Sequence, residues 1–298
     1  MIYQNEFRID FIGIGASKSG TTWIAEVLRK HPGIYFPTKR KEVNYFSKYL
    51  AQDYHTKNLD YEKPYSWYHN FFKDAKPGQL VGEITPSYLS MDNSSTDIHN
   101  YNPGIKIFAV LRNPVERSYS EYLFSRQNGV NSYKDFKEAI DSNPAKFIKS
   151  SMYYENMARY YQFFQAENIK IFFYEDLKKD NKAFLKELYN FLQVDEFYYE
   201  GFDTTVNRGQ QAKSQKLNNF IGKTKMFIHS KNLHFLIPAM EKTGILKIIK
   251  SVKRKNLTSR ISKETIKPEL KNELINYFIK DIEHLETLTG KNLSHWKI

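Results

Sequence analysis

The chain has 298 residues, of which 41% are hydrophobic and 16% aromatic, so it can bury the core of one large or two ordinary domains. It contains no cysteine, which excludes disulfides, cysteine metal sites and thiol nucleophiles. Its formal net charge of +12 favours anionic ligands, among which nucleic acid has to be considered. Basic and acidic residues are interspersed, and no zinc-finger, homeodomain or RNA-recognition signature occurs, so we expect no nucleic-acid partner.

The first residues bear on where the protein resides. Glu6, Arg8 and Asp10 lie next to the first apolar run and leave no room for the apolar core of a signal peptide. No apolar run approaches the ~20 residues of a membrane-spanning helix. We therefore expect a cytoplasmic protein with no integral membrane segment.

The stretch from Phe11 to Trp23 predicts a strand, a glycine turn and a helix. Apolar residues crowd together from Ile9 to Ile14, and apolar residues then recur at helical spacing from Thr21 as far as Pro32. Such a turn binds phosphate because its backbone N–H groups point inward and the helix adds the positive end of its dipole. The lysine and hydroxyl groups of this stretch would supply charge and further donors, so we expect an anionic ligand.

The turn differs from the Walker A loop of ATPases and kinases. The spacing from Gly15 to Gly20 is that of a Walker A loop, but Thr21 stands where the motif has its lysine, and Lys18 lies two residues before Gly20. The clearest later strand ends in Arg112 and offers no acidic magnesium ligand. We therefore expect chemistry at a phosphate with no metal required. A strand, turn and helix that bind nothing are the plain alternative.

Further elements follow at regular intervals along the chain. Strands that alternate with helices predict an α/β, P-loop-type three-layer fold with a central parallel β-sheet flanked by helices. No internal repeat or linker is visible, so we predict one domain over residues 1–298, with a helical insertion around 210–262. The expected strands are Leu80 to Ile84, Lys106 to Leu111 and Ile169 to Tyr174, and the expected helices lie within Pro64 to Phe72, Tyr133 to Ile140, Met152 to Ala166, Asn181 to Leu192 and from Leu270 onward.

A second motif begins where the strand Lys106 to Leu111 ends. Asn113 is a good helix cap, Pro114 suits the first helical position and Glu116 would complete a capping box. Arg112 lies at the carboxyl end of the strand, where open α/β sheets bind ligands, and a guanidinium can grip a phosphate with two hydrogen bonds. Taken alone, Arg112 is more simply interpreted as the partner of a carboxylate.

Together these motifs resemble the sulfotransferases that use 3′-phosphoadenosine 5′-phosphosulfate (PAPS), in the bacterial and heparan-like branch. The resemblance rests on Gly15 to Trp23, on Leu28, His31 and Pro32, and on Lys41, Glu42 and Phe46. It implies that the loop holds the 5′-phosphosulfate and that Lys18 contacts the oxygen that leaves from sulfur. The donor-binding residues that it implies are Lys18, Ser19, Gly20, Thr21, Thr22, Trp23, and, on the 3′-phosphate, Arg112 and Ser120.

Two glutamates are candidates for the catalytic base. Glu42 lies in a stretch that resembles the one where heparan-type sulfotransferases carry a catalytic glutamate, and Glu83 ends a predicted strand near the place of the histidine in small-molecule sulfotransferases. We prefer Glu42 as base, with Glu83 as a second carboxylate or a substrate ligand; a surface role for either is the plain alternative.

The sequence departs from the family pattern in two places. Ile84 stands where the heparan-type enzymes have a lysine, and the basic glycine loop that closes over the 3′-phosphate is not recognisable. Arg208, Lys213 or the cluster Lys253 to Lys255 could replace that loop, and the residues favour none of the three over the others.

The resemblance implies transfer of a sulfuryl group from PAPS to a hydroxyl or amine, which leaves PAP, the 3′,5′-bisphosphate. By analogy the acceptor is a carbohydrate. A small secondary metabolite is the main alternative, because the aromatic stretches Tyr45 to Tyr68 and Tyr153 to Phe164 could line an apolar pocket. A P-loop kinase or NTPase and an anion-binding or nucleic-acid-binding module are the alternatives from other classes. Whether the chain forms a homodimer is left open.

Overall fold

The computed structural model of the chain describes residues 7–38, 40–51, 54–128, 133–203 and 265–298, with short pieces at 211–212, 214, 217, 243–244, 251–252 and 256–258. The predicted insertion around 210–262, and with it Arg208, Lys213 and Lys253 to Lys255, lies almost entirely outside the described residues. None of the described helices is long and apolar enough to cross a bilayer.

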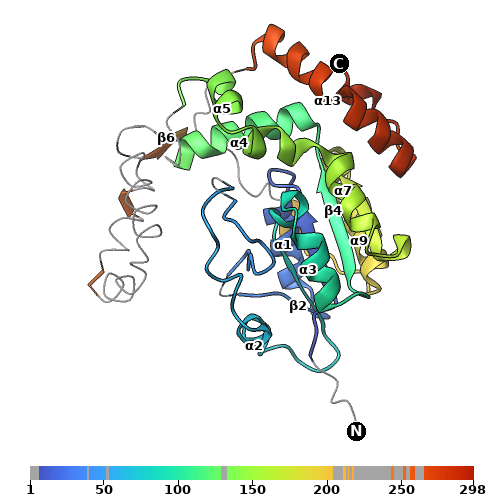
Figure 1. Cartoon of the computed structure of the whole chain (residues 1–298). Helices are drawn as coiled ribbons and strands as arrows, with labels where there is room; N and C mark the ends of the chain where they lie inside the picture. The colour runs from blue at the N-terminus through green and yellow to red at the C-terminus, as the bar shows by residue number, and fades with distance from the viewer. Residues whose placement is uncertain are drawn as a thin grey trace.

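A five-stranded sheet in the order β2-β3-β1-β4-β5 forms the centre of the structure (Figure 1). All of its strand pairs are parallel, so the carboxyl ends of the strands meet at one edge. The predicted parallel α/β fold is confirmed. The strands are β1 (Phe11–Gly15), β2 (Ile34–Tyr35), β3 (Leu80–Ile84), β4 (Lys106–Leu111) and β5 (Ile169–Phe173).

Helices cover both faces of this sheet because successive side chains of each strand point to opposite faces. Along β4, Ile107 and Ala109 join one buried cluster, whereas Phe108 and Val110 join the other. The first cluster includes residues of α3 (Ser94–Tyr101), α4 (Pro114–Asn128), α5 (Phe136–Ser142), α6 (Pro144–Phe147), α7 (Tyr153–Tyr161) and α13 (Pro268–Thr289). The second includes residues of α1 (Thr21–Lys30) and α9 (Asn181–Leu192). In Figure 1 the red helix α13 lies beside α7.

The predicted helices occur in the predicted order with several bounds changed, but the helices α3, α6 and α8 (Tyr174–Lys179) were not predicted. The helix predicted from Tyr133 begins at Phe136 because Asp135 caps it through a bond from the Glu138 N–H. The bounds are α1 (Thr21–Lys30), α2 (Tyr65–His69), α3 (Ser94–Tyr101), α4 (Pro114–Asn128), α5 (Phe136–Ser142), α6 (Pro144–Phe147), α7 (Tyr153–Tyr161), α8 (Tyr174–Lys179), α9 (Asn181–Leu192) and α13 (Pro268–Thr289), with β6 (Gln211–Ala212) and β7 (Leu257–Thr258) as a separate antiparallel pair.

The start of α4 confirms the predicted cap and corrects the predicted capping box. Asn113 Oδ1 accepts from the N–H of Val115 at 3.0 Å and of Glu116 at 3.2 Å. The Glu116 carboxylate does not return to Asn113. It binds Arg112 instead, and the Asn113 N–H donates to Glu175 Oε1 at 3.1 Å. A carboxylate from α8 therefore takes the place of the second half of the box.

A carboxylate from the C-terminal helix caps α7. Asp281, buried on α13, accepts from the N–H of Tyr153 at 2.7 Å, of Tyr154 at 3.0 Å and of Glu155 at 3.3 Å. Burial raises the pKa of this carboxyl from 3.8 to about 6, against the opposing effect of the three N–H donors. Asp281 thus joins α13 to α7 through a contact with Tyr153, which lies 128 residues away in the sequence.

Replacing Asp281 by Asn should change the pH dependence of stability. Because its pKa is higher in the folded protein, the folded protein binds the proton more tightly, and the free energy of unfolding falls as pH rises from about 4 to 6. Relative to the variant, we expect wild type to lose about 2–3 kcal/mol over that window. Urea denaturation at several pH values measures the difference.

The control for this prediction is Glu283→Gln, on the exposed side of the same helix. That substitution should leave the pH profile as in wild type. An identical profile for wild type and Asp281→Asn would contradict the assignment of the buried carboxyl as the titrating group.

Candidate active site

The predicted phosphate loop lies between β1 and α1, at the carboxyl edge of the sheet. Its backbone is left-handed at Lys18 (φ 70°) and at Gly20 (φ 83°), and a Cβ on Gly20 would lie 2.9 Å from Leu177 Cδ2. The N-cap of α1 is Gly20, which has no side chain to cap the helix, and no side chain of the described residues accepts from its first N–H groups. The first N–H groups of a helix have no partner within it, so this end offers donors and positive dipole to an anion.

Ser19 gives the loop an unused buried donor. Its side chain is fully buried, and its Oγ has no hydrogen-bond partner among the residues that the structure describes. A buried hydroxyl without a hydrogen-bond partner destabilises the folded protein by about 1–3 kcal/mol, and a bound acceptor would remove that cost. A phosphate or sulfate oxygen is an acceptor of the required kind, so the loop fits an anionic ligand.

Lys18 is held over an aromatic ring beside the loop. Its Nζ lies 3.8 Å from the centre of the Phe124 ring on α4. Burial lowers the pKa of Lys18, the charge of Glu121 opposes that change, and the charges of Lys41, Arg112 and Arg117 add to it. Four cations therefore surround the loop within electrostatic reach of one another.

The sequence did not single out Glu121, a buried carboxylate on α4. Its Oε2 accepts from Ser17 Oγ at 3.3 Å, and its Oε1 accepts from Ser125 Oγ at 3.4 Å and lies 3.6 Å from Lys146 Nζ. The nearby Arg117 guanidinium is buried and donates to the Ser151 hydroxyl at 2.6 Å and to two backbone carbonyls. These three acceptors are neutral, so they leave the positive charge of Arg117 uncompensated, and that charge acts on Lys18.

Arg112 brings the two predicted motifs together. Its Nη1 donates to the Lys18 carbonyl at 3.3 Å, and its guanidinium lies 5.0 Å from the Tyr174 ring centre. Its Nη2 binds the Glu116 carboxylate at 2.9 Å, which is the ion pair that the plain interpretation expected. Ser120 lies half buried on α4, eight residues further along the chain.

The remaining loop residues differ in how open they are. Thr21 is buried and Thr22 is partly exposed. Trp23 is nearly buried, and its indole N–H donates to the Phe202 carbonyl at 3.0 Å. Trp23 therefore packs the first turn of α1 into the core.

Glu42 lies beside the loop with its side chain 40% exposed. Lys41 Nζ lies 3.0 Å from Glu42 Oε1 and donates to Thr22 Oγ1 at 2.6 Å. Lys41 therefore ties Glu42 to the first turn of α1. This carboxylate is open to solvent and is linked to the first turn of α1 through Lys41.

Glu83 has a different environment, because it is completely buried. Its Oε1 accepts from Tyr68 at 2.8 Å and Tyr88 at 3.0 Å, and its Oε2 accepts from Thr85 Oγ1 at 2.7 Å and the Val43 N–H at 3.3 Å. Burial raises the pKa of the Glu83 carboxyl against these four donors. Such a group holds neighbouring segments in place, and an acceptor cannot reach it.

The aromatic stretches that could line a substrate pocket are largely part of the core, although Tyr49, Tyr65 and Phe163 are exposed. Tyr45 stacks on Tyr68 with ring centres 4.7 Å apart, and Tyr153 and Tyr160 are completely buried. Ile84 is also buried, against Gly13 of β1. These residues belong to the buried clusters that pack on the two faces of the sheet.

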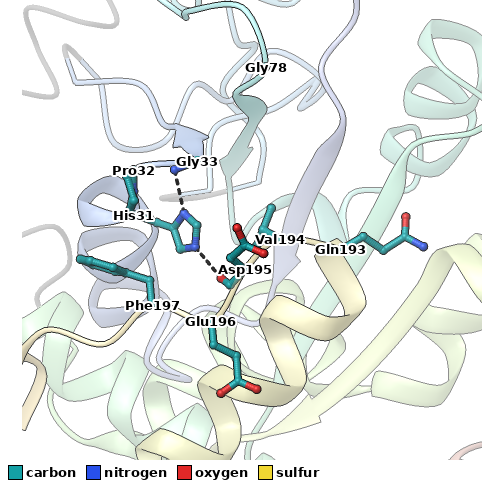
Figure 2. Close-up of a pocket in the computed structure, with 9 residues that line it drawn as sticks. All are labelled: His31, Pro32, Gly33, Gly78, Gln193, Val194, Asp195, Glu196 and Phe197. Carbon is teal, nitrogen blue, oxygen red and sulfur yellow. Dashed lines mark hydrogen bonds between the residues drawn. The ribbon is translucent and has the colours of Figure 1, made fainter.

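The hollow drawn in Figure 2 lies at the other end of the sheet, where β2 and β3 begin. It has a volume of about 290 Å³. His31 accepts from the Gly33 N–H at 3.0 Å and bonds the Asp195 carbonyl at 2.8 Å, so it ties α1 to the end of α9. It takes no part in the site at the loop. Within the described ranges, no three His, Asp or Glu side chains converge to hold a metal ion.

Comparisons with known proteins agree with these motifs. Residues 8–290 match the family model described as "Sulfotransferase domain". The "Membrane-associated sulfotransferase kil1" of Dictyostelium discoideum is 36% identical over 121 residues, which are 40% of this chain and 23% of that protein. "Heparan sulfate glucosamine 3-O-sulfotransferase 6" of Homo sapiens is 30% identical over 123 residues, which are 41% of this chain and 32% of that protein. The matches span about a quarter to a third of these relatives.

A solved structure resembles the whole fold. The structure of a sulfotransferase from Alicyclobacillus acidocaldarius superposes with a TM-score of 0.68, at 20% sequence identity, over 98% of this chain and 100% of that one. This similarity concerns the arrangement of sheet and helices.

Glu83→Ala should destabilise the protein far more than Glu42→Ala. Removing the buried carboxylate leaves four donors without their acceptor, and we expect the free energy of unfolding to fall by about 3–5 kcal/mol. Glu42→Ala, a partly exposed position, should change it by less than about 1 kcal/mol. Chemical denaturation measures both values, and equal values would contradict the structural role of Glu83.

Proposed function

Because the chain belongs to the sulfotransferase family, we propose that it moves a sulfuryl group from PAPS to a hydroxyl or amine of a carbohydrate. The observation that carries this proposal is the phosphate loop, with its uncapped helix start and the unpartnered buried hydroxyl of Ser19. The cations around the loop complement a donor that carries two phosphates and a sulfate.

The loop would hold the 5′-phosphosulfate of the donor. Ser19 Oγ and the first N–H groups of α1, around Thr21 and Thr22, would donate to its oxygens. Lys18 would leave the Phe124 ring and pair with the oxygen that carries the new negative charge when the S–O bond breaks.

Arg112 would hold the 3′-phosphate together with Ser120. In the structure without ligand, Arg112 is paired with Glu116, so a phosphate has to replace that carboxylate or share the guanidinium with it. An exposed pair of this kind contributes about 0–1 kcal/mol, which a bidentate phosphate contact exceeds.

The reaction then needs a base for the acceptor's proton. As the acceptor oxygen or nitrogen attacks sulfur, the bond from sulfur to the PAP oxygen breaks, and the acceptor's proton passes to the Glu42 carboxylate. Glu42 is the better candidate because it is partly exposed beside the loop, whereas Glu83 is enclosed and already accepts four hydrogen bonds. Glu83 would also position Glu42, because it accepts a hydrogen bond from the N–H of Val43, the residue that follows Glu42.

Relatives support a carbohydrate acceptor, since one of them is named for transfer to heparan sulfate glucosamine. A cytoplasmic location and a homodimer stay predictions. Another relative is named as membrane-associated.

PAP should bind without metal, and Lys18→Ala should weaken that binding by about ten- to a hundredfold, the value of one or two charge-assisted hydrogen bonds. Calorimetric titration measures the affinity. Lys48→Ala, an exposed lysine outside the site, is the matched control and should bind as wild type does. Binding of magnesium ATP in preference to PAP would overturn the proposal in favour of a kinase or NTPase.

Glu42→Gln should lower kcat by about a hundred- to ten-thousandfold, the range that general bases supply. The affinity for PAP should stay within about threefold of wild type, because the proposed base does not hold the donor. Turnover with a panel of glucosamine-containing oligosaccharides measures the first quantity and calorimetry the second. Wild-type turnover in the variant would rule out Glu42 as the base.

A further inference from the structure

Lys41 has contacts that the functions assigned above do not explain. Its ammonium donates to Thr22 Oγ1 in the first turn of α1 and lies against the Glu42 carboxylate. The side chain is 32% exposed, so a ligand at the loop can reach it. Lys41 therefore stands between the proposed donor site and the proposed base.

Lys41 is one of several cations near Lys18. Its charge acts on Lys18 and helps to lower the pKa of that lysine, as the charges of Arg112 and Arg117 do. The carboxylates that face this group are Glu42 beside Lys41, Glu116 beside Arg112, and Glu121 on α4. Like charges gathered beside a helix start repel one another until an anion arrives between them.

A purely structural role explains these contacts less well. A partly exposed ion pair between neighbouring residues adds little stability, typically below about 1 kcal/mol. The bond to Thr22 places the ammonium at the first turn of α1, beside the loop that would hold the phosphosulfate. The end of β3 supplies no cation there, since the residue after Glu83 is the buried Ile84.

Resting on the proposed function, we propose that Lys41 is a second catalytic cation, which binds the oxygens of the transferring sulfuryl group and keeps Glu42 beside it. Lys18 serves the oxygen that stays with PAP, and Lys41 serves the sulfuryl group that is transferred to the acceptor. The two ammonium groups thus bind opposite sides of the S–O bond that breaks. A contact to the sulfuryl group is made with PAPS and is absent with PAP.

The absence of cysteine allows a selective test of this role. In Lys41→Cys the introduced thiol is the only one in the chain, and alkylation with 2-bromoethylamine rebuilds an ammonium of nearly the length of lysine. We expect Lys41→Cys to bind PAPS about ten- to a hundredfold more weakly than wild type, and to bind PAP within about threefold. Aminoethylation should restore PAPS affinity, and alkylation with iodoacetamide, which adds no charge, should not.

Lys48→Cys is the matched control, because Lys48 is exposed in the segment between β2 and α2 that also contains Lys41. This variant should bind both ligands as wild type does, before and after alkylation. An equal loss of PAP and PAPS affinity in Lys41→Cys, or restoration of PAPS affinity by iodoacetamide, would overturn the role and leave Lys41 as a structural tie. Failure of wild type to bind PAP at all would instead overturn the proposed function, and the role of Lys41 with it.

Discussion

The concentration of positive charge at one edge of the sheet is the constraint on which the rest of the site depends. Parallel strands bring their carboxyl ends together, and the start of α1 adds an uncapped dipole there. Lys18, Lys41 and Arg112 converge on the same place, with Arg117 buried behind them. Glu42, Glu116 and Glu121 oppose part of this charge, and the donor that we propose, with its several charged oxygens, is of the class that complements the rest.

Two carboxylates near this edge, Glu83 and Glu42, have very different surroundings. Glu83 is enclosed by hydroxyl and amide donors and serves to hold β3, the segment around Val43 and the aromatic core together. Glu42 stays partly exposed and faces the loop. A glutamate can thus stabilise the fold, as Glu83 does, or act as a base, as we propose for Glu42. The difference lies in how many donors already occupy its oxygens and in whether an acceptor can approach it.

The sequence was sufficient for the parts of the fold that local patterns determine. Continuous apolar runs predicted β3 and β4 with their observed bounds, and the Asn113–Pro114 pair predicted the start of α4. It was insufficient where partners come from distant segments. Arg117, Glu121 and Ser125 recur every four residues on α4, a polar spacing that normally marks a solvent-facing side, yet all three are buried. Nor could the spacing show that Glu175 would replace Glu116 at the cap.

The cap that Asp281 provides for α7 has a consequence for biosynthesis. The ribosome completes α7 well before it reaches α13, because 128 residues separate Tyr153 from Asp281. During that interval the first N–H groups of α7 have no carboxylate, and the apolar face that α13 covers stays open to water. The nascent chain can form the β1–α1 loop early, but this side of the molecule closes late in translation, when chaperones have most reason to engage it.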